Sequence, residues 1–176
     1  KRVADAERLV EGVGRYFDVE PSAPDALAAR LRAAGAARSA LGLLLADRRA
    51  FVLKLKGSVD ADGLAELADR SPALRKTDVV ILHDLVLERV LGIDAAAQAA
   101  QKNIRYFKEE AAARAELASG GSGAQALFLM NPTPVAQVEE VARAGDVMPQ
   151  KSTYFYPKVL TGIAMRSLDP NETLLG

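Results

Sequence analysis

Two short apolar runs, joined by three charged residues, constrain the fold of this chain more than any other feature. Residues 41–46 form a continuous apolar run, and residues 51–56 alternate apolar side chains with Lys54 and Lys56. A period of two is typical of a β-strand that buries one face and exposes the other. With Asp47-Arg48-Arg49 between them, the two runs predict an antiparallel hairpin over residues 40–56.

Helical periodicity precedes this hairpin. Residues 5–17 repeat apolar side chains at helical spacing, although Gly12 and Gly14 weaken a helix there. Ser22, with an acid three residues later, has the pattern of a capping box and predicts the start of a second helix. Gly35 is the expected end of that helix.

Two further helices are expected after the hairpin. Asp60 is placed to cap a short one, which Ser71-Pro72 would end. Residues 78–91 look like a strand by composition, but at about 100° per residue their large apolar side chains share one broad arc. Asp84 and Glu88 lie together on the opposite side. The spacing therefore predicts a helix over residues 78–91, with a solvated acidic face.

The last third of the chain alternates between strand and helix patterns. Strands are predicted over residues 103–108, 125–130 and 158–166, with helices over residues 109–119 and from Thr133-Pro134 onward. That order suggests βαβ-type connections. The expected fold class is therefore α+β (mixed α/β), with N-terminal helices and a β-hairpin followed by a β-α-β-α-β C-terminal portion.

The length of 176 residues fits one domain. The alternative is a pair of sub-lobes over residues 1–76 and 77–176. Because the first residue is Lys1 and not Met, we expect the chain to be a fragment of a longer protein.

Composition excludes several classes of function. Lys and Arg number 23 and Asp and Glu also number 23, and this balance argues against nucleic-acid binding, which needs an excess of cations. The lack of Cys excludes disulfides, thiolate catalysis and Cys-ligated metals, and a single His excludes a His-rich metal centre. No apolar run is long enough to span a bilayer and no signal peptide opens the chain, so we expect a soluble, cytoplasmic protein.

The segment over residues 148–158 has the most unusual chemistry. Three of the nine Phe and Tyr residues are consecutive there, beside two ammonium groups. Such donors next to aromatic faces suit an anionic or planar ligand. The alternative is that strand-like alternation buries Phe155 and leaves Lys151 solvated. The candidate catalytic residue of this segment is Lys151, and its candidate ligand-binding residues are Gln150, Ser152, Thr153, Tyr154, Tyr156 and Lys158.

Two other segments contain candidate site residues. Asn131 and Thr133 lie where a strand is expected to meet a helix, and the N–H groups at a helix N-terminus hold anions. The alternative for Thr133 is ordinary capping. His83, on the apolar arc of the 78–91 helix, is a candidate catalytic base or ligand contact, or else a hydrogen-bonded core residue. Asp84 and Glu88 alone are weak grounds for a metal site.

Several of these motifs together resemble domain-of-unknown-function family 1015, a family of bacterial and archaeal proteins. The resemblance rests on Asn131-Pro-Thr-Pro-Val135, on the turn over residues 144–149 and on Gln150-Lys-Ser-Thr-Tyr-Phe-Tyr-Pro-Lys158. Supporting matches are Leu82-His-Asp-Leu-Val-Leu-Glu88, Leu91-Gly-Ile-Asp94 and Asn103-Ile-Arg-Tyr106. They occur in the expected order over residues 78–167, whereas the first 75 residues resemble the family only loosely.

The resemblance implies a divided site. Complete members of the family carry an upstream Asp-Gly-His-His-Arg-Tyr motif, similar to that of the ParB/sulfiredoxin-like superfamily, which includes nucleotide hydrolases and free-serine kinases. This chain has no His-His pair, so it would be the C-terminal part, retaining His83 and the 151–158 segment. Family members are often encoded near serine-biosynthesis enzymes, which favours amino-acid or phospho-metabolite chemistry.

Two hypotheses of function follow. In the first, the chain is part of an enzyme acting on a small phosphorylated, nucleotide or amino-acid substrate, with kinase-like phosphotransfer as one form. Lys151 and Lys158 would neutralise phosphate, and His83 would act as a base. Any nucleotide with Mg²⁺ would bind in the full-length protein, whose upstream carboxylates would hold the metal. In the second, the chain is a non-catalytic ligand-binding or scaffolding domain that packs against its own N-terminal region.

Overall fold

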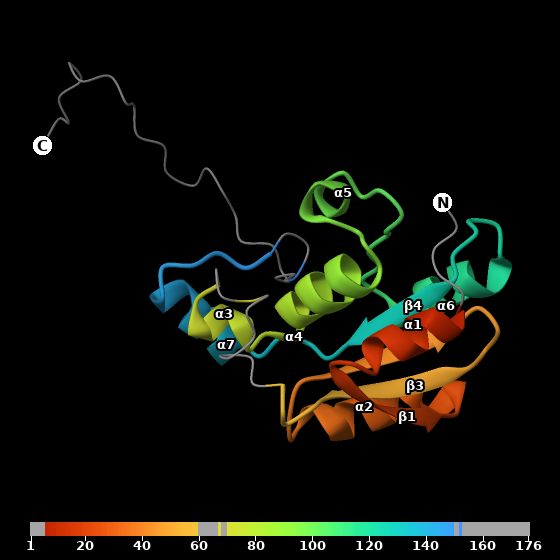
Figure 1. The fold of residues 1–176 in the computed structure, drawn as a ribbon, viewed down its shortest axis with the longest axis horizontal. Coiled ribbons are helices and arrows are strands. Elements are labelled where there is room, and N and C mark those ends of the chain that lie inside the picture. Colours follow the sequence, from red (N-terminus) through yellow and green to blue (C-terminus); the bar gives the residue numbers. More distant parts are fainter. Residues whose placement is uncertain (1–5, 60–66, 68–69, 150–151, 153–176) are drawn as a thin grey trace, which may run out of the picture.

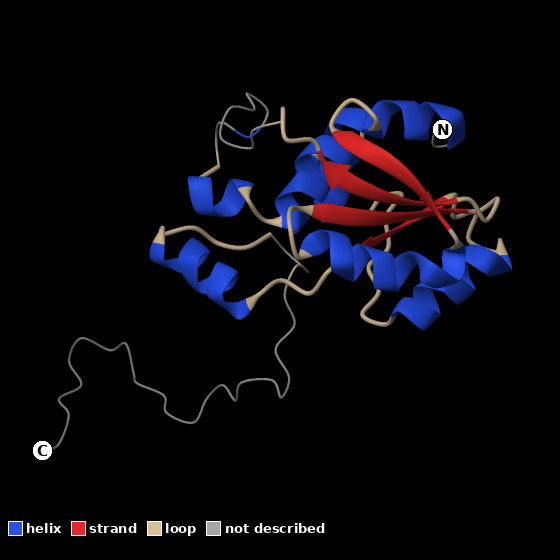
Figure 2. Ribbon diagram, turned by 90° about the horizontal axis from the view of Figure 1, so that it is seen from below, coloured by secondary structure: helices blue, strands red, loops and turns tan. Residues whose placement is uncertain are grey.

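A four-stranded antiparallel sheet lies at the centre of the fold (Figure 1). The computed structural model describes residues 6–59, 67, 70–149 and 152. The strands are β1 (Phe17–Ser22), β2 (Ala40–Leu45), β3 (Ala50–Leu55) and β4 (Ala126–Met130), in the spatial order β1-β3-β2-β4. Helices lie on both faces of the sheet (Figure 2), which makes a three-layered α+β arrangement and confirms the expected class.

The predicted hairpin is confirmed as the centre of this sheet. Strands β2 and β3 pair antiparallel, with Leu41 opposite Leu53 and Leu44 opposite Ala50. The loop between them closes through the N–H of Leu45, which donates to the carbonyl oxygen of Arg49 at 2.9 Å. Every residue of β2 is buried, because β2 has a neighbouring strand on each side and helices over both faces. That position explains why its sequence is continuously apolar and does not alternate.

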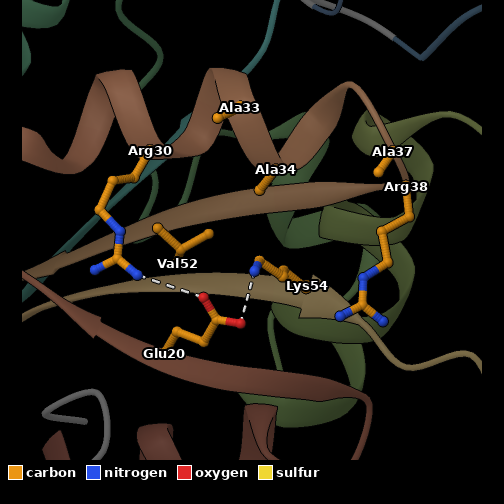
Figure 3. A pocket seen from close by; sticks show the side chains of 8 residues that line it. All are labelled: Glu20, Arg30, Ala33, Ala34, Ala37, Arg38, Val52 and Lys54. Carbon is orange, nitrogen blue, oxygen red and sulfur yellow. Dashed lines mark hydrogen bonds and ion pairs between the residues drawn. The ribbon is translucent and has the colours of Figure 1, made fainter.

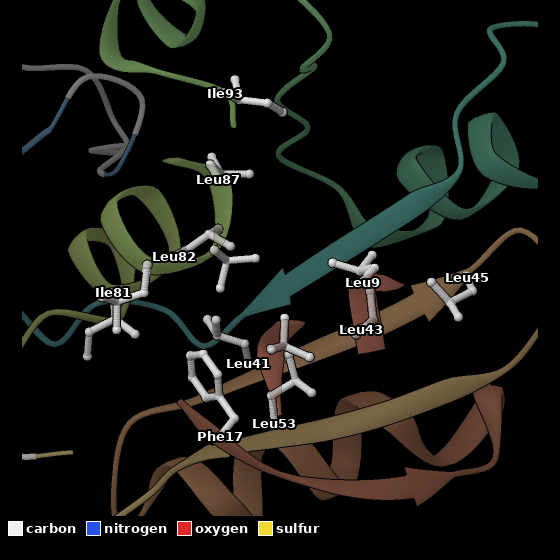
Figure 4. Packing of buried hydrophobic residues seen from close by; sticks show 13 residues of the cluster. Leu9, Phe17, Leu41, Leu43, Leu45, Leu53, Ile81, Leu82, Leu87 and Ile93 are labelled. Carbon is white, nitrogen blue, oxygen red and sulfur yellow. The ribbon is translucent and has the colours of Figure 1, made fainter. Parts of the chain in front are cut away.

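Alternate side chains of the hairpin enter two separate cores. On one face, the side chains pack against helix α1 (Ala6–Val13) and helix η3 (Ile81–Val90), as Figure 4 shows. On the other face, they pack against helix α2 (Leu27–Gly35) and against Leu117 of helix α6 (Glu110–Ser119). The first core includes Leu41, Leu43, Leu45 and Leu53; the second includes Ala40, Leu44, Ala50 and Val52.

The N-terminal helices exist, but two of their boundaries were predicted wrongly. The helix expected over residues 5–17 ends at Val13, and Phe17 begins strand β1. Ser22 caps no helix, because it is paired with Ala50 in the sheet and its hydroxyl donates to the Ala23 carbonyl oxygen. A 3₁₀ turn, η1 (Pro24–Ala26), leads into α2. The expected end of α2 at Gly35 is confirmed.

The helix predicted over residues 78–91 is confirmed, with an unexpected geometry. A single turn, α4 (Asp78–Val80), leads directly into η3, which is a π-helix. The N–H of Leu91 donates to the Val86 carbonyl oxygen, five residues earlier, at 2.9 Å. Asp84 is one of the buried residues of η3 and is only 8 % exposed. The expectation that Asp84 lies on a solvated face was therefore wrong.

Two short helices flank η3. Ser71 was expected to end a helix, but it begins one: its Oγ accepts a hydrogen bond from the Leu74 N–H at the start of α3 (Pro72–Arg75). Helix α5 (Ala95–Ala99) follows η3 and is capped by Asp94. The helix expected to begin at Asp60 falls mostly outside the described residues.

The C-terminal third agrees with the prediction in part. Helix α6, strand β4 and helix α7 (Val135–Arg143) are present, and α7 ends just before Gly145, whose φ is +79°. Residues 103–108 form no strand and lead as a loop into α6. Strand β4 pairs antiparallel with β2, so the described part has no parallel βαβ unit. The strand expected over residues 158–166 lies outside the described residues.

A third apolar cluster joins α7 to the helices before η3. Val141 of α7 is fully buried among Leu74 of α3 and Val79 and Val80 of α4. Figure 1 shows α3 and α7 side by side at one end of the molecule. No helix in the described ranges is both long enough and apolar enough to cross a membrane.

Candidate functional site

The π-helix η3 carries the most chemically distinctive group of side chains in the described structure. Arg70, just before α3, forms a bidentate pair with Asp84: its Nε lies 3.1 Å from Oδ2 and its Nη2 lies 3.3 Å from Oδ1. His83 is the adjacent residue, and its ring centroid lies 6.2 Å from that of Tyr106. We call His83, Asp84, Arg70 and Tyr106 the His83 cluster.

His83 is half-buried, and its surroundings favour the neutral imidazole. Burial lowers the pKa of His83, Asp84 opposes this shift and Arg70 adds to it. Within the described residues, the backbone carbonyl oxygen of His83 accepts a hydrogen bond from Gln98, but no side chain bonds to its ring nitrogens. The ring is therefore neutral at pH 7 and can accept a proton.

The other members of the cluster have defined electrostatic roles. Asp84 is engaged by Arg70, so its charge is compensated within the cluster. The guanidinium of Arg70 is half-exposed and uses Nε and Nη2 for Asp84, so Nη1 is not used in this pair. Burial raises the pKa of Tyr106, so its phenol stays protonated at neutral pH. The cluster therefore combines one proton acceptor, one cation and one hydroxyl donor.

Asn131 has a structural role that its sequence context did not reveal. Its Nδ2 donates to the Leu31 carbonyl oxygen of α2 at 3.2 Å. A Cβ atom at Gly35 would overlap that same amide. Asn131 therefore attaches the end of β4 to the last turn of α2, and its amide is occupied by this contact.

Thr133 and Ser152 are the other ligand-binding candidates that the structure describes. Thr133 does not cap α7, because Pro134 occupies the N-cap position and no side chain bonds there. Ser152 Oγ donates to the Pro149 carbonyl oxygen. Lys151, Gln150, Thr153, Tyr154, Tyr156 and Lys158 lie outside the described residues.

Another hollow on the described surface lies between α2 and strands β1 and β3 (Figure 3). It has a volume of about 460 Å³ and its charged groups are paired within the protein. Glu20 accepts from Lys54 at 2.6 Å and from Arg30 at 3.4 Å, and Arg38 pairs with Asp18 at 3.0 Å. Because these cations are already neutralised, the hollow is a weaker candidate for anion binding than its size suggests.

No family model, no curated protein and no solved structure matches this chain. In the described ranges, no three His, Asp or Glu side chains gather as a metal ion would require.

Sequence reasoning found His83 but missed Arg70. Asp84 and Arg70 are fourteen positions apart, and no helical or strand spacing connects them. Tyr106 was noted only within the Asn103-Ile-Arg-Tyr106 match, where a strand was expected. The sequence signal that could have pointed to Arg70 is the acid beside the only His in a strongly apolar helix. A buried carboxylate is usually paired with a cation, so a partner for Asp84 could have been sought.

The lowered pKa of His83 predicts a pH-dependent stability. Between the ordinary pKa of about 6.5 and the lower folded value, the unfolded chain binds more protons than the folded one. Stability should therefore fall as the pH is lowered from 7 through that window, and His83→Gln should flatten the slope there. Urea denaturation of both proteins at several pH values tests this. A slope that is unchanged in His83→Gln would contradict it.

Proposed function

We propose that this chain is the C-terminal part of an enzyme that acts on a small phosphate-bearing or amino-acid metabolite, with His83 as its acid–base residue. Phosphotransfer is one form of this activity. The resemblance to domain-of-unknown-function family 1015 agrees with it, because that resemblance implies a second half of the site upstream.

The observation that carries the proposal is the setting of the His83 imidazole. A half-buried neutral ring with no side-chain partner among the described residues is placed beside the Arg70–Asp84 pair. In a purely structural core histidine, the ring nitrogens normally form hydrogen bonds within the protein. A π-helix is rare, and such turns occur frequently at functional sites, which supports the same conclusion.

An anionic group is the substrate feature that this setting favours. Arg70 Nη1 supplies a donor that is not used for Asp84, and the cation would attract a phosphate or carboxylate toward the ring. Once an anion is bound, the imidazolium form of His83 gains a counter-charge, so the pKa of His83 should rise. Lys151 and Lys158 are the further cations that the proposal assigns to phosphate.

The second candidate is a non-catalytic domain that packs against an N-terminal region. Its support is the exposure of two valines: Val135, the first residue of α7, at 76 %, and Val147, in the segment after that helix, at 84 %. Isolated apolar side chains are common on surfaces, so this candidate is the weaker of the two.

The single histidine allows a direct test of the proposal. In an NMR titration, the imidazole C–H signals belong to His83 alone. We expect at least one of phosphoserine, serine, inorganic phosphate and Mg-ATP to shift these signals saturably. A phosphate-bearing ligand should also raise the pKa of His83. Arg70→Gln should weaken the effect, whereas Arg143→Gln, at an exposed arginine of α7 that pairs with Glu139, should not.

The outcome that rejects the proposal is equally specific. If none of these compounds moves the His83 signals or changes their titration, His83 takes no part in ligand binding. The packing role then becomes the better explanation, and an N-terminal segment added in trans should protect Val135 and Val147 from solvent.

A further inference from the structure

A second hollow, lined by three arginines, lies apart from the His83 cluster. It has a volume of about 270 Å³ and lies between α1 and the C-terminal end of η3. We call it the arginine pocket, after Arg8, Arg15 and Arg89, which line it together with Glu11 and Tyr16. His83 lies near the opposite end of η3, so the two sites are separate.

Helix packing explains why these arginines meet. Arg8 lies in the first turn of α1, and Arg15 lies in the turn that follows the helix, where its N–H donates to the Gly12 carbonyl oxygen. The backbone of α1 comes very close to η3 at Gly12, where a Cβ atom would lie 2.5 Å from Val90 Cγ1. Arg89 precedes Val90, so side chains from both helices reach one hollow.

The charges of the arginine pocket are not compensated within the described structure. Seven other described arginines form ion pairs with carboxylates: Arg30, Arg38, Arg49, Arg70, Arg105, Arg114 and Arg143. Arg8, Arg15 and Arg89 form none with any described residue, and Glu11 also forms none. A chain with zero net charge therefore concentrates an excess of two positive charges here.

We propose that the arginine pocket binds a phosphate group, carried by a small metabolite or as free phosphate or pyrophosphate. Guanidinium groups bind phosphate oxygens in pairs, and two or three of them match an anion of charge two or more better than a single carboxylate. The volume is just below the range of about 300–1,000 Å³ that holds drug-sized ligands. It therefore favours a compact anion. Tyr16 adds a hydroxyl donor at the same hollow.

The test uses pyrophosphate as the probe in isothermal titration calorimetry, with the whole chain at constant ionic strength. Arg89→Gln and Arg15→Gln should each raise the Kd by at least about tenfold, the loss expected for one charge-assisted contact. The matched control is Arg32→Gln, an exposed helical arginine on α2 without a carboxylate partner among the described residues. It removes the same charge away from the pocket and should leave the Kd unchanged.

A second measurement separates binding from a structural role. Each substitution removes one of three like charges, so the thermal midpoint of unfolding of the unliganded variant should be unchanged or higher. The rise in this midpoint that pyrophosphate causes in the original protein should be lost in the variant. The proposal is overturned if pyrophosphate shows no saturable binding up to about 10 mM. It is also overturned if Arg32→Gln weakens binding as much as Arg89→Gln does. Because His83 is not part of this pocket, His83→Gln should keep the affinity, and either proposal can fail alone.

Discussion

Replacing Leu43 with alanine is expected to lower the free energy of unfolding by about 2–5 kcal/mol. Leu43 has no exposed surface and lies in the middle of the central strand β2, between β3 and β4. Its side chain enters the core formed with α1 and η3 (Figure 4). Because helices and neighbouring strands hold that space open, the structure relaxes little into the cavity. Urea denaturation followed by circular dichroism measures the change.

The matched control is Leu129→Ala. It removes the same atoms from the edge strand β4, where the side chain is only half-buried, so its cost should be clearly smaller than that of Leu43→Ala. The dependence of unfolding on urea concentration should stay unchanged if both proteins keep the same folded state. Equal costs for the two substitutions would contradict the placement of the central core.

The second large effect is expected at the closest approach of α1 and η3. Gly12→Val should lower the free energy of unfolding by about 1–3 kcal/mol, because the added side chain would overlap Val90 and force the helices apart. Helix propensity alone would favour valine over glycine. A loss of stability therefore reports the steric contact, and thermal or urea denaturation measures it.

A double-mutant cycle identifies the contact partner. In the double variant, the volume removed by Val90→Ala makes room for the side chain added by Gly12→Val. The double variant should therefore lose less unfolding free energy than the sum of the two single losses, by about 0.5–3 kcal/mol. Additive effects would mean that Gly12 and Val90 do not oppose each other. The same contact brings Arg8, Arg15 and Arg89 together, so Gly12→Val should also weaken pyrophosphate binding.

The parts of the fold that local pattern determines were predictable. The hairpin over residues 40–56 follows from the change to a period of two, and the helix over residues 78–91 follows from its apolar arc. The hairpin forms the centre of the sheet, and the helix packs against one face of it. Local sequence preference and tertiary packing therefore agree there.

The errors arose where tertiary contacts decide the conformation. Phe17 continues the helical apolar pattern of α1, yet pairing with Leu55 makes it the start of β1. Ser22 has the sequence of a helix cap, but its pairing in the same strand extends its backbone. Residues 103–108 alternate like a strand but have no neighbouring strand in the described structure. None of these partners can be read from the adjacent sequence.

The sequence predicted one residue of the candidate site but not the residues that contact it. His83 could be singled out because it is the only histidine, whereas the Arg70–Asp84 pair depends on how α3 meets η3. Asn131 was assigned to a ligand because a strand end followed by a helix often binds anions. The missing information was the tertiary contact: Gly35 lies against the end of β4 and, having no side chain, leaves the room that Asn131 occupies.

The strand order also has a consequence for the order of folding. The two central strands are neighbours in sequence, so β2 and β3 can pair by closing a very short loop. The edge strand β4 joins them from far along the chain, with Ala126 opposite Leu45, and its loop-closure entropy is larger. We therefore expect the hairpin to be formed in the folding transition state and β4 to dock late. Residues Asn131 and Gly35 then hold the last strand in place only after the rest of the sheet exists.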